Sequence, residues 1–308
     1  MNVISTKDDI FELLKPDGGK FGVESLSDSY KFCKKVTYGH YENFPVGSLL
    51  IPKYNRNYFY SIYTFSRFAD DIADELDYED KAIKISSLEK LSDMIESYNP
   101  DDFIIKNPLL FALRDTILNK ELPYEPFRKL ITAFIMDSDF SQPESMDDNI
   151  NYCKYSANPV GELVLRLFDN YDSQTALLSD SICTGLQLVN FWQDISVDID
   201  KKRIYLPNDI LQKYDIDKKT LFNSPSEAKL EACLQEIYEK TENFFIFGSE
   251  LSNYIKNKRL KYEIKLTVES GKFILEKVRK LGIKITFIRP KLNKTDFILL
   301  FFKIFFSK

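Results

Sequence analysis

An arginine and several carboxylates interrupt an otherwise apolar helical pattern near residue 70. Over residues 62–76 apolar side chains recur at three- and four-residue intervals, the period of an amphipathic helix. On that helix Asp70 and Asp74 lie one turn apart, beside Asp71 and on the stripe that also carries Arg67. Two carboxylates at this spacing present hard oxygens to one point, which suits Mg²⁺. A solvated acidic face is the alternative interpretation.

A second cluster of oxygen-bearing side chains favours the metal interpretation. Three of them recur at four-residue steps in a helix predicted over residues 180–200: Asn190, Asp194 and Asp198. Arg203 and Tyr205 follow directly, so a cation and a phenol stand where this helix is expected to end. The second stretch is therefore another candidate cation-binding rail.

Two acidic helices, each with an arginine nearby, can face each other across a cavity and hold several Mg²⁺ ions around one strongly negative group. A diphosphate fits this requirement, because Mg²⁺ binds phosphate oxygens readily and arginine adds bidentate hydrogen bonds to them. The chain has no P-loop motif and no dinucleotide fingerprint. We therefore expect more than one Mg²⁺ and no nicotinamide.

The composition indicates helices as the elements that position these side chains. Only 10 Gly and 12 Pro occur in 308 residues, few for a β-rich or doubly wound fold. Amphipathic patterns predict helices before residue 40, from Pro52 to about residue 80, and over 81–98, 108–118 and 123–138. Proline and glycine interrupt the pattern near residues 45–47 and 159–161. The expected fold is all-α, in a single domain over residues 1–308.

Charge and cysteine usage exclude several classes of protein. The net charge is −5 and the basic residues are dispersed, so nothing favours nucleic acid binding. The four cysteines are far apart and His40 is the single histidine, which argues against a zinc site or a disulfide framework and favours a reducing compartment. Since the N-terminus does not read as a secretory signal, we expect a cytoplasmic protein.

Four stretches carry a family resemblance: residues 43–52, 62–75, 152–161 and 185–207. The last ends in Arg-Ile-Tyr-Leu-Pro, and the two aspartate motifs at this separation form a specific signature. The chain resembles the squalene and phytoene synthase family over most of its length. This resemblance implies an isoprenoid-synthase helical bundle around a central cavity, and an enzyme that acts on a prenyl diphosphate with diphosphate as the leaving group.

The resemblance also implies roles for individual residues of this chain. The expected metal ligands are Asp70, Asp71, Asp74, Asn190, Asp194 and Asp198. The expected catalytic residues are Arg67, Tyr152, Arg203 and Tyr205. The expected substrate-binding residues are His40, Phe44, Ser48, Gln187, Gln193 and Arg289. Arg289 is the weakest match, and a lone histidine is more often a packed or capping residue than a functional one.

Three segments look most like the hydroxysqualene synthase branch of bacterial hopanoid pathways: residues 42–46, 156–161 and 190–194. Many other family members carry arginine where this chain has Gln193. One positive charge fewer beside the diphosphate is consistent with a changed substrate, because an arginine there would have made charge-assisted hydrogen bonds. An exposed polar residue without a role is the alternative interpretation.

The expected reaction converts presqualene diphosphate and water into hydroxysqualene and pyrophosphate. An alternative within the enzyme class is head-to-head condensation of two prenyl diphosphates to presqualene diphosphate, squalene, dehydrosqualene or phytoene. An alternative of another class is a family member without catalysis that acts in assembly or interaction, and other enzymes of the pathway are candidate partners.

The apolar C-terminal tail, residues 296–308, is shorter than the roughly 20 residues that a membrane-spanning helix needs. Two alternatives stay open for it. The tail could lie in the membrane interface beside its lysines, which would place the enzyme at the inner face of the membrane. It could instead dock its apolar face on the protein core.

Overall fold

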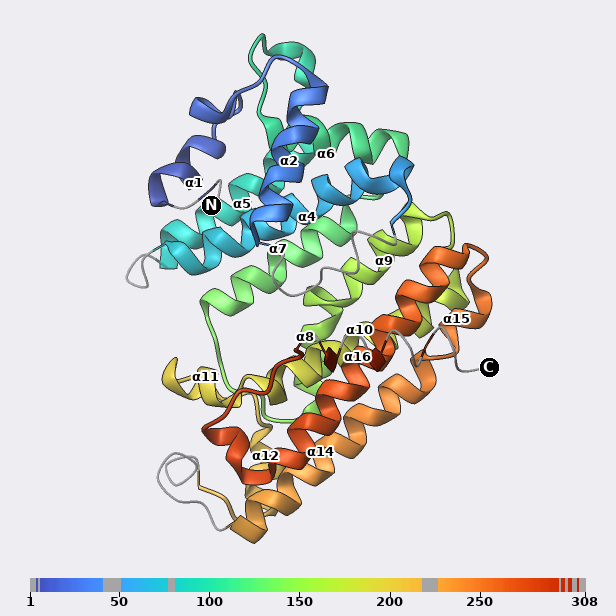
Figure 1. Cartoon of the computed structure of the whole chain (residues 1–308). Helices are drawn as coiled ribbons and strands as arrows, with labels where there is room; N and C mark the ends of the chain where they lie inside the picture. Colours follow the sequence, from blue (N-terminus) through green and yellow to red (C-terminus); the bar gives the residue numbers. More distant parts are fainter. Residues whose placement is uncertain are drawn as a thin grey trace. The chain divides into compact units, whose positions relative to one another are not determined.

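The computed structural model describes residues 4, 6–40, 51–76, 81–217, 227–293, 295, 296, 299, 300 and 304. The regular structure of these residues is helical, with no β-strand among them (Figure 1). One isolated antiparallel bridge joins Val23 to Lys106. The all-α prediction is confirmed.

The chain divides into two compact units. Unit 1 contains Met1–Asp139 and Leu163–Asn170, and unit 2 contains Phe140–Glu162 and Tyr171–Lys308. The first acidic cluster belongs to unit 1 and the second to unit 2. The single domain expected over residues 1–308 stays a prediction.

Unit 1 is a helical bundle whose core is organised around α4. Its described helices are α1 (Lys7–Leu13), η1 (Gly19–Phe21), α2 (Leu26–His40), α4 (Lys53–Glu75), α5 (Lys81–Ser97), η2 (Pro100–Asp102), α6 (Pro108–Asn119), α7 (Glu125–Ser138) and the end of α9 (Asn158–Leu167). Helices α2, α4 and α6 pack on one another, and α5 packs on α7 (Figure 1). The predicted apolar face of α4 is buried: Phe65, Phe68 and Ile72 are 0% exposed.

Both ends of α4 are tied to other parts of unit 1. Near its start, the buried Asn55 donates from Nδ2 to the Leu167 carbonyl over 2.7 Å. Near its end, the buried Lys84 donates from Nζ to the Ala73 carbonyl over 2.5 Å. A cation at a helix C-terminus satisfies a free carbonyl and complements the helix dipole. These contacts fix the segment of α4 that carries the acidic cluster.

Unit 2 is built around α10. Its described helices are α8 (Met146–Ser156), the start of α9, α10 (Ser173–Gln193), α11 (Ile195–Asp200), α12 (Asn208–Lys213), α14 (Glu227–Gly248), α15 (Leu251–Tyr254), α16 (Lys258–Leu281) and η3 (Gly282–Thr286). Helix α10 packs on α8, α14 and α16 (Figure 1). A Cβ at Gly271 would lie 2.6 Å from Phe245 Cζ, so glycine lets α16 approach α14 closely.

The interruption predicted at residues 152–161 is a break between two helices. Ala157 alone separates α8 from α9. A Cβ at Gly161 would lie 2.5 Å from Ser179 Oγ on α10, so the glycine permits a close helix contact. The helix predicted over residues 180–200 begins earlier, at Ser173, because Asp172 caps it by accepting from the backbone N–H of Thr175. It also breaks at Asp194 into α10 and α11.

Parts of the C-terminal tail pack on unit 2. Leu300 and Ile304 are 2% and 9% exposed, and Asp296 lies 2.5 Å from Lys277 Nζ on α16. For these residues the structure favours docking on the core, whereas Leu299 is 62% exposed. Among the described residues, no helix combines the length and apolar character needed to cross a membrane.

Glu263 on α16 gives a testable pH dependence of stability. Its Oε2 is buried without a hydrogen-bond partner among the described residues, and burial raises its pKa from 4.5 to about 7. A carboxyl with a raised pKa contributes most stability below pH 4.5, and this contribution is lost as the pH rises through 7. We predict that Glu263→Gln raises the free energy of unfolding by roughly 3 kcal/mol at pH 8 and by about 1 kcal/mol at pH 5.

Denaturant unfolding at the two pH values measures this difference. The exposed Glu231 supplies a matched control, and as a surface substitution Glu231→Gln should change the free energy of unfolding by less than about 0.5 kcal/mol. An equal effect of Glu263→Gln at pH 5 and pH 8 would contradict the prediction.

Candidate active site

Arg67 holds two carboxylates of the first acidic cluster on α4. Its Nη1 donates to Asp70 Oδ2 over 2.8 Å, and its Nη2 lies 2.5 Å from Asp71 Oδ1. The partners are three and four residues further on, the spacing at which helical side chains meet. Because the Asp71 side chain is 4% exposed and that of Asp70 39%, the guanidinium bridges a buried carboxylate and an open one.

Charge compensation within this cluster is local. Burial lowers the pKa of Arg67, but the charges of Asp71 and Asp70 outweigh it, so the pKa is raised. The guanidinium stays ionised and compensates the buried Asp71. Asp74, one turn beyond Asp70, is exposed. Of the three predicted metal ligands on α4, Asp70 and Asp71 both pair with Arg67, Asp70 partly exposed and Asp71 buried, and Asp74 is exposed.

The second cluster spans the junction of α10 and α11. Asp194 ends one helix and precedes the next, at φ −97° and ψ 6°. Backbone hydrogen bonds continue across the junction, from Asp194 N to Asn190 O over 3.0 Å and from Asp198 N to Asp194 O over 2.8 Å. The four-residue steps predicted for these three residues are therefore preserved although the helix is not continuous.

Asp198 carries an incompletely compensated charge. Burial, and next the charge of Asp194, raise its pKa to about 6. Lys201, Arg203 and Arg289 act in the opposite direction without cancelling these effects. A bound cation would stabilise the ionised form of this carboxylate.

The segment around Arg289 is fastened to the same junction. Arg289 forms a two-point ion pair with Asp194, from Nε to Oδ1 over 2.5 Å and from Nη2 to Oδ2 over 3.0 Å. The neighbouring Gln193 donates from Nε2 to the Pro290 carbonyl over 2.7 Å. Gln193 therefore helps to hold residues 289–290 in place. Arg289, in the same segment, is a cation beside the second cluster.

Contacts with aromatic rings bring the predicted catalytic residues of unit 2 close together. The ring of Tyr205 stacks on Phe191 at a centroid distance of 4.0 Å and an interplanar angle of 11°, and Tyr152 packs on Phe191 at 5.8 Å. Phe140 meets the Tyr205 ring at 5.0 Å, and the Arg203 guanidinium lies 5.9 Å from the Phe140 centroid. Sequence reasoning missed Phe191 and Phe140, because aromatic residues at helical spacing are usually core.

The turn after α11 makes this arrangement possible. Arg203 N donates to the Asp198 carbonyl over 2.8 Å, and Lys202 has a left-handed φ of 58°. Asn149 on α8 donates from Nδ2 to the Tyr205 carbonyl over 3.0 Å. The chain therefore folds back over α11 and brings Arg203 and Tyr205 to its side.

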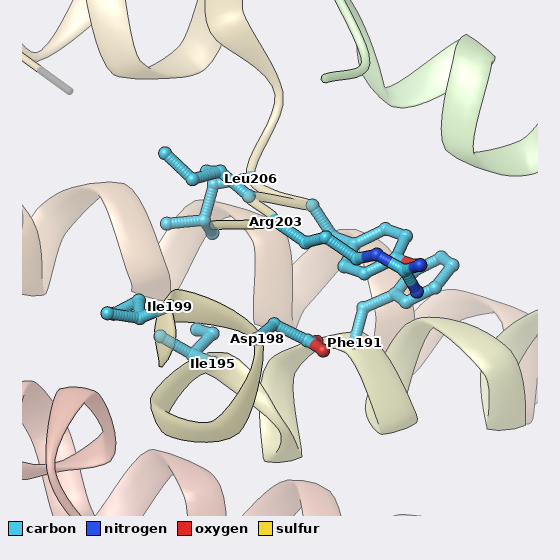
Figure 2. Close-up of a pocket in the computed structure, with 8 residues that line it drawn as sticks. Phe191, Ile195, Asp198, Ile199, Arg203 and Leu206 are labelled. Carbon is cyan, nitrogen blue, oxygen red and sulfur yellow. The ribbon is translucent and has the colours of Figure 1, made fainter. Parts of the chain in front are cut away.

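A small pocket lies between this turn and the two helices. Its volume is about 10 Å³, enough for about one water molecule. Figure 2 shows Asp198, Arg203 and Phe191 directed to one side of the pocket, and Ile195 and Ile199 lying on the other.

The donor chemistry of both clusters fits Mg²⁺. Each offers carboxylate oxygens one helical turn apart, and Asp198 lacks full compensation. Among the described residues no group of three or more acidic, cysteine or histidine side chains is close enough to form a complete metal cage. In Mg²⁺ sites one or two carboxylates commonly share the ion with substrate phosphates. The metal assignments stay predictions.

Other predicted residues are placed less fully. Gln187 lies on α10 one turn before Asn190 and Phe191, so it shares their face. Helix α2 ends at His40, whose side chain lies outside the described part of the chain, as do Phe44 and Ser48 entirely. Their assignment to substrate binding stays a prediction.

Comparison with known proteins identifies the family. The family model described as squalene/phytoene synthase matches residues 38–296. The hydroxysqualene synthase of Rhodopseudomonas palustris is 33% identical over 224 residues, 72% of this chain and 74% of that protein. The hydroxysqualene synthase of Zymomonas mobilis is 32% identical over 228 residues, with the same coverage. The phytoene synthase of Mycobacterium tuberculosis is 26% identical over 231 residues, 73% of this chain and 74% of that protein.

Solved structures give the same result for the fold. The squalene synthase HpnC from Alicyclobacillus acidocaldarius matches with a TM-score of 0.76 at 32% identity, covering 83% of this chain and 95% of that one. A dehydrosqualene synthase matches with a TM-score of 0.78 at 22% identity, covering 91% and 96%. The all-α isoprenoid-synthase fold is therefore confirmed. With the family model matching most of its length, the chain belongs to the squalene/phytoene synthase family of enzymes.

Proposed function

We propose that this enzyme is a hydroxysqualene synthase, which converts presqualene diphosphate and water into hydroxysqualene and pyrophosphate. The observation that carries the proposal is the order of the relatives. Three proteins named hydroxysqualene synthase are 31–33% identical over 72% of the chain, whereas phytoene synthases are 26% identical over a similar length. The proposal agrees with the neutral Gln193, whose amide binds a backbone carbonyl.

The first step of the proposed reaction is ionisation. The carbon–oxygen bond to the diphosphate breaks, the electron pair leaves with pyrophosphate, and a cyclopropylcarbinyl cation remains. Arg67 and Arg203 would hold the departing anion, since guanidinium groups bind phosphate oxygens in two-point contacts. Both side chains lie beside acidic residues proposed for metal binding. Cationic groups for the diphosphate and anionic groups for Mg²⁺ are therefore next to each other in each cluster.

Mg²⁺ would be held by Asp70 and Asp74 in unit 1 and by the residues of the α10–α11 junction in unit 2. When bound, it would supply positive charge that stabilises the diphosphate as it leaves. Asp71 and Arg289 support this arrangement in the proposal, because they compensate Arg67 and Asp194 respectively.

The second step of the proposed reaction is capture of the rearranged cation by water. The oxygen of water forms the new bond to carbon, and its proton is released, so that one water is consumed for each pyrophosphate formed. Aromatic ring faces stabilise cations, and the stack of Tyr152, Phe191 and Tyr205 offers them beside the predicted catalytic residues. No reductant is needed for this ending.

Condensation of two prenyl diphosphates is the second candidate. A specific observation favours it: a relative of 32% identity is described as a squalene synthase, so relatives at equal identity carry names for different products. A non-catalytic role has less support, because the arginines and carboxylates of both clusters are present.

The proposal also includes a biological setting: hopanoid synthesis, contacts with pathway enzymes and a site at the inner membrane face.

The choice of substrate gives the first test. Purified enzyme with Mg²⁺ should release hydroxysqualene and pyrophosphate from presqualene diphosphate, and chelation of the metal should abolish the reaction. The same enzyme should turn over farnesyl diphosphate alone at least about 100-fold more slowly, measured by product analysis. Efficient conversion of farnesyl diphosphate to squalene, dehydrosqualene or phytoene would overturn the proposal in favour of the second candidate.

Two aspartates on α11 give a matched test of the second cluster. Asp198 has a half-buried carboxyl beside Arg203, whereas Asp200 is exposed. We predict that Asp198→Asn lowers kcat about 100-fold or more, as expected for loss of electrostatic stabilisation of the leaving group. Asp200→Asn should keep kcat within about twofold. Equal losses in both variants, measured under saturating Mg²⁺, would remove Asp198 from the proposed machinery.

A further inference from the structure

The ion pair between Arg289 and Asp194 joins two parts of unit 2 that are far apart in the sequence. Residues 287–293, the C-terminal strap, follow η3 without regular secondary structure. The strap meets the α10–α11 junction at two adjacent points. Arg289 pairs with Asp194, and the carbonyl of the next residue, Pro290, accepts from Nε2 of Gln193, the residue before Asp194. Two consecutive residues of the strap therefore match two consecutive residues of the junction.

This ion pair occupies both carboxylate oxygens of a predicted metal ligand. Nε of Arg289 lies 2.5 Å from Oδ1 of Asp194, and Nη2 lies 3.0 Å from Oδ2. Mg²⁺ binds oxygens of the same kind. A metal ion on this carboxylate would lie within a few ångströms of the guanidinium, where like charges repel each other. The arginine and a metal ion therefore compete for Asp194.

The arginine of the first cluster cannot leave its partners as easily. Arg67 lies on the same helix as Asp70 and Asp71, and the Asp71 side chain is 4% exposed. Withdrawal of Arg67 would leave a buried carboxylate without compensation, which is costly. In the second cluster the side chains of Asp194 and Arg289 are 19% and 35% exposed, so water reaches both partners. Opening of this pair therefore costs less.

Opening needs only the Arg289 side chain to move, because the backbone after it is held in place. Pro290 is buried, and its carbonyl accepts from Gln193 over 2.7 Å. The carbonyl of Lys291 accepts from Nζ of Lys277 on α16 over 3.0 Å. A long side chain at the protein surface changes rotamer rapidly. Gln193 thus keeps Arg289 within reach of Asp194 whether the ion pair is closed or open.

We infer that Gln193 is a positioning residue that holds Arg289 against Asp194, and that this ion pair must open before Asp194 can bind a metal ion. Arg289 compensates the carboxylate until the metal takes its place, and so it lowers the affinity of the second cluster for metal alone. The inference rests on the metal binding proposed for the α10–α11 junction, but not on the identity of the prenyl substrate.

Binding of Mn²⁺ to the full chain, without any diphosphate, tests the competition. Mn²⁺ prefers the same oxygen ligands as Mg²⁺, and electron paramagnetic resonance measures the free ion. Arg289→Gln should bind Mn²⁺ about tenfold more tightly than the wild type, because a charge-assisted contact no longer opposes the metal. The matched control Arg279→Gln removes an arginine of α16 that pairs with Glu242 and Glu276, and its affinity should stay within about twofold of the wild type.

A neutral variant separates positioning from loss of charge. Gln193→Met removes the amide that binds the Pro290 carbonyl and keeps the net charge, and it should strengthen Mn²⁺ binding about threefold. In the double variant with Arg289→Gln, Gln193→Met should add nothing, because a positioning residue has no effect once the residue it positions is gone. The control Gln235→Met, at an exposed glutamine of α14, should bind Mn²⁺ as the wild type does.

The Nε–H group of Arg289 gives a direct signal of the ion pair. Its cross-peak in a ¹⁵N nuclear magnetic resonance spectrum is identified by its loss in Arg289→Gln. Saturating Mg²⁺ should shift this signal in the wild type and speed the exchange of its proton with water, because the group leaves Asp194 for solvent. The signal of Arg279 should not change. Circular dichroism and gel filtration verify that each variant is folded.

Each of three results would overturn the inference. Arg289→Gln could bind Mn²⁺ no more tightly than the wild type or the Arg279→Gln control, Gln193→Met could strengthen binding equally with and without Arg289, or saturating Mg²⁺ could leave the Arg289 signal unchanged. Failure of the proposed function gives a different result. An enzyme that shows this exchange but forms no hydroxysqualene from presqualene diphosphate would contradict the proposed reaction and leave the inference intact.

Discussion

Compensation of clustered carboxylates by arginine is the interaction on which both acidic clusters depend. On α4, Asp71 can be buried because Arg67 stays charged beside it. At the α10–α11 junction, Arg289 reaches Asp194 from a distant part of the chain. Without these ion pairs the helices would carry unpaired like charges one turn apart, which weakens a helix. Asp74 lies outside the first ion pair and is exposed, and Asp198 lies outside the second with its charge incompletely compensated, so both are suited to a cation.

The helices of each unit keep these charges in place. In unit 1 the buried face of α4 and the contacts of Asn55 and Lys84 fix the helix that carries Arg67. In unit 2, the buried Trp192 donates from Nε1 to Thr241 Oγ1 over 2.9 Å, which fastens the end of α10 to α14. The polar face of each helix is thus set by the packing of its apolar face.

Periodicity made much of this predictable from the sequence. The apolar stripe of α4, the four-residue steps of the second cluster and the break near Gly161 all follow from local patterns. The ion pair of Arg289 with Asp194 and the stack of Phe191 on Tyr205 could not be derived in this way. They join residues that only the folded chain brings together, and an aromatic residue at helical spacing looks like any core residue. The break at Asp194 was not predicted, because the helical pattern of side chains continues on both sides of this residue.

We propose that the acidic residues of α4 and those of the α10–α11 junction each take part in Mg²⁺-dependent binding of diphosphate. Calorimetric titration with methylenediphosphonate, with and without Mg²⁺, tests it directly on the wild type, Asp74→Asn and Asp198→Asn. We expect Mg²⁺-dependent binding by the wild type and a loss of affinity of at least about 100-fold in each single variant, since each removes a charged group that would contact the metal. Affinity that is independent of Mg²⁺, or unchanged in either variant, would contradict it.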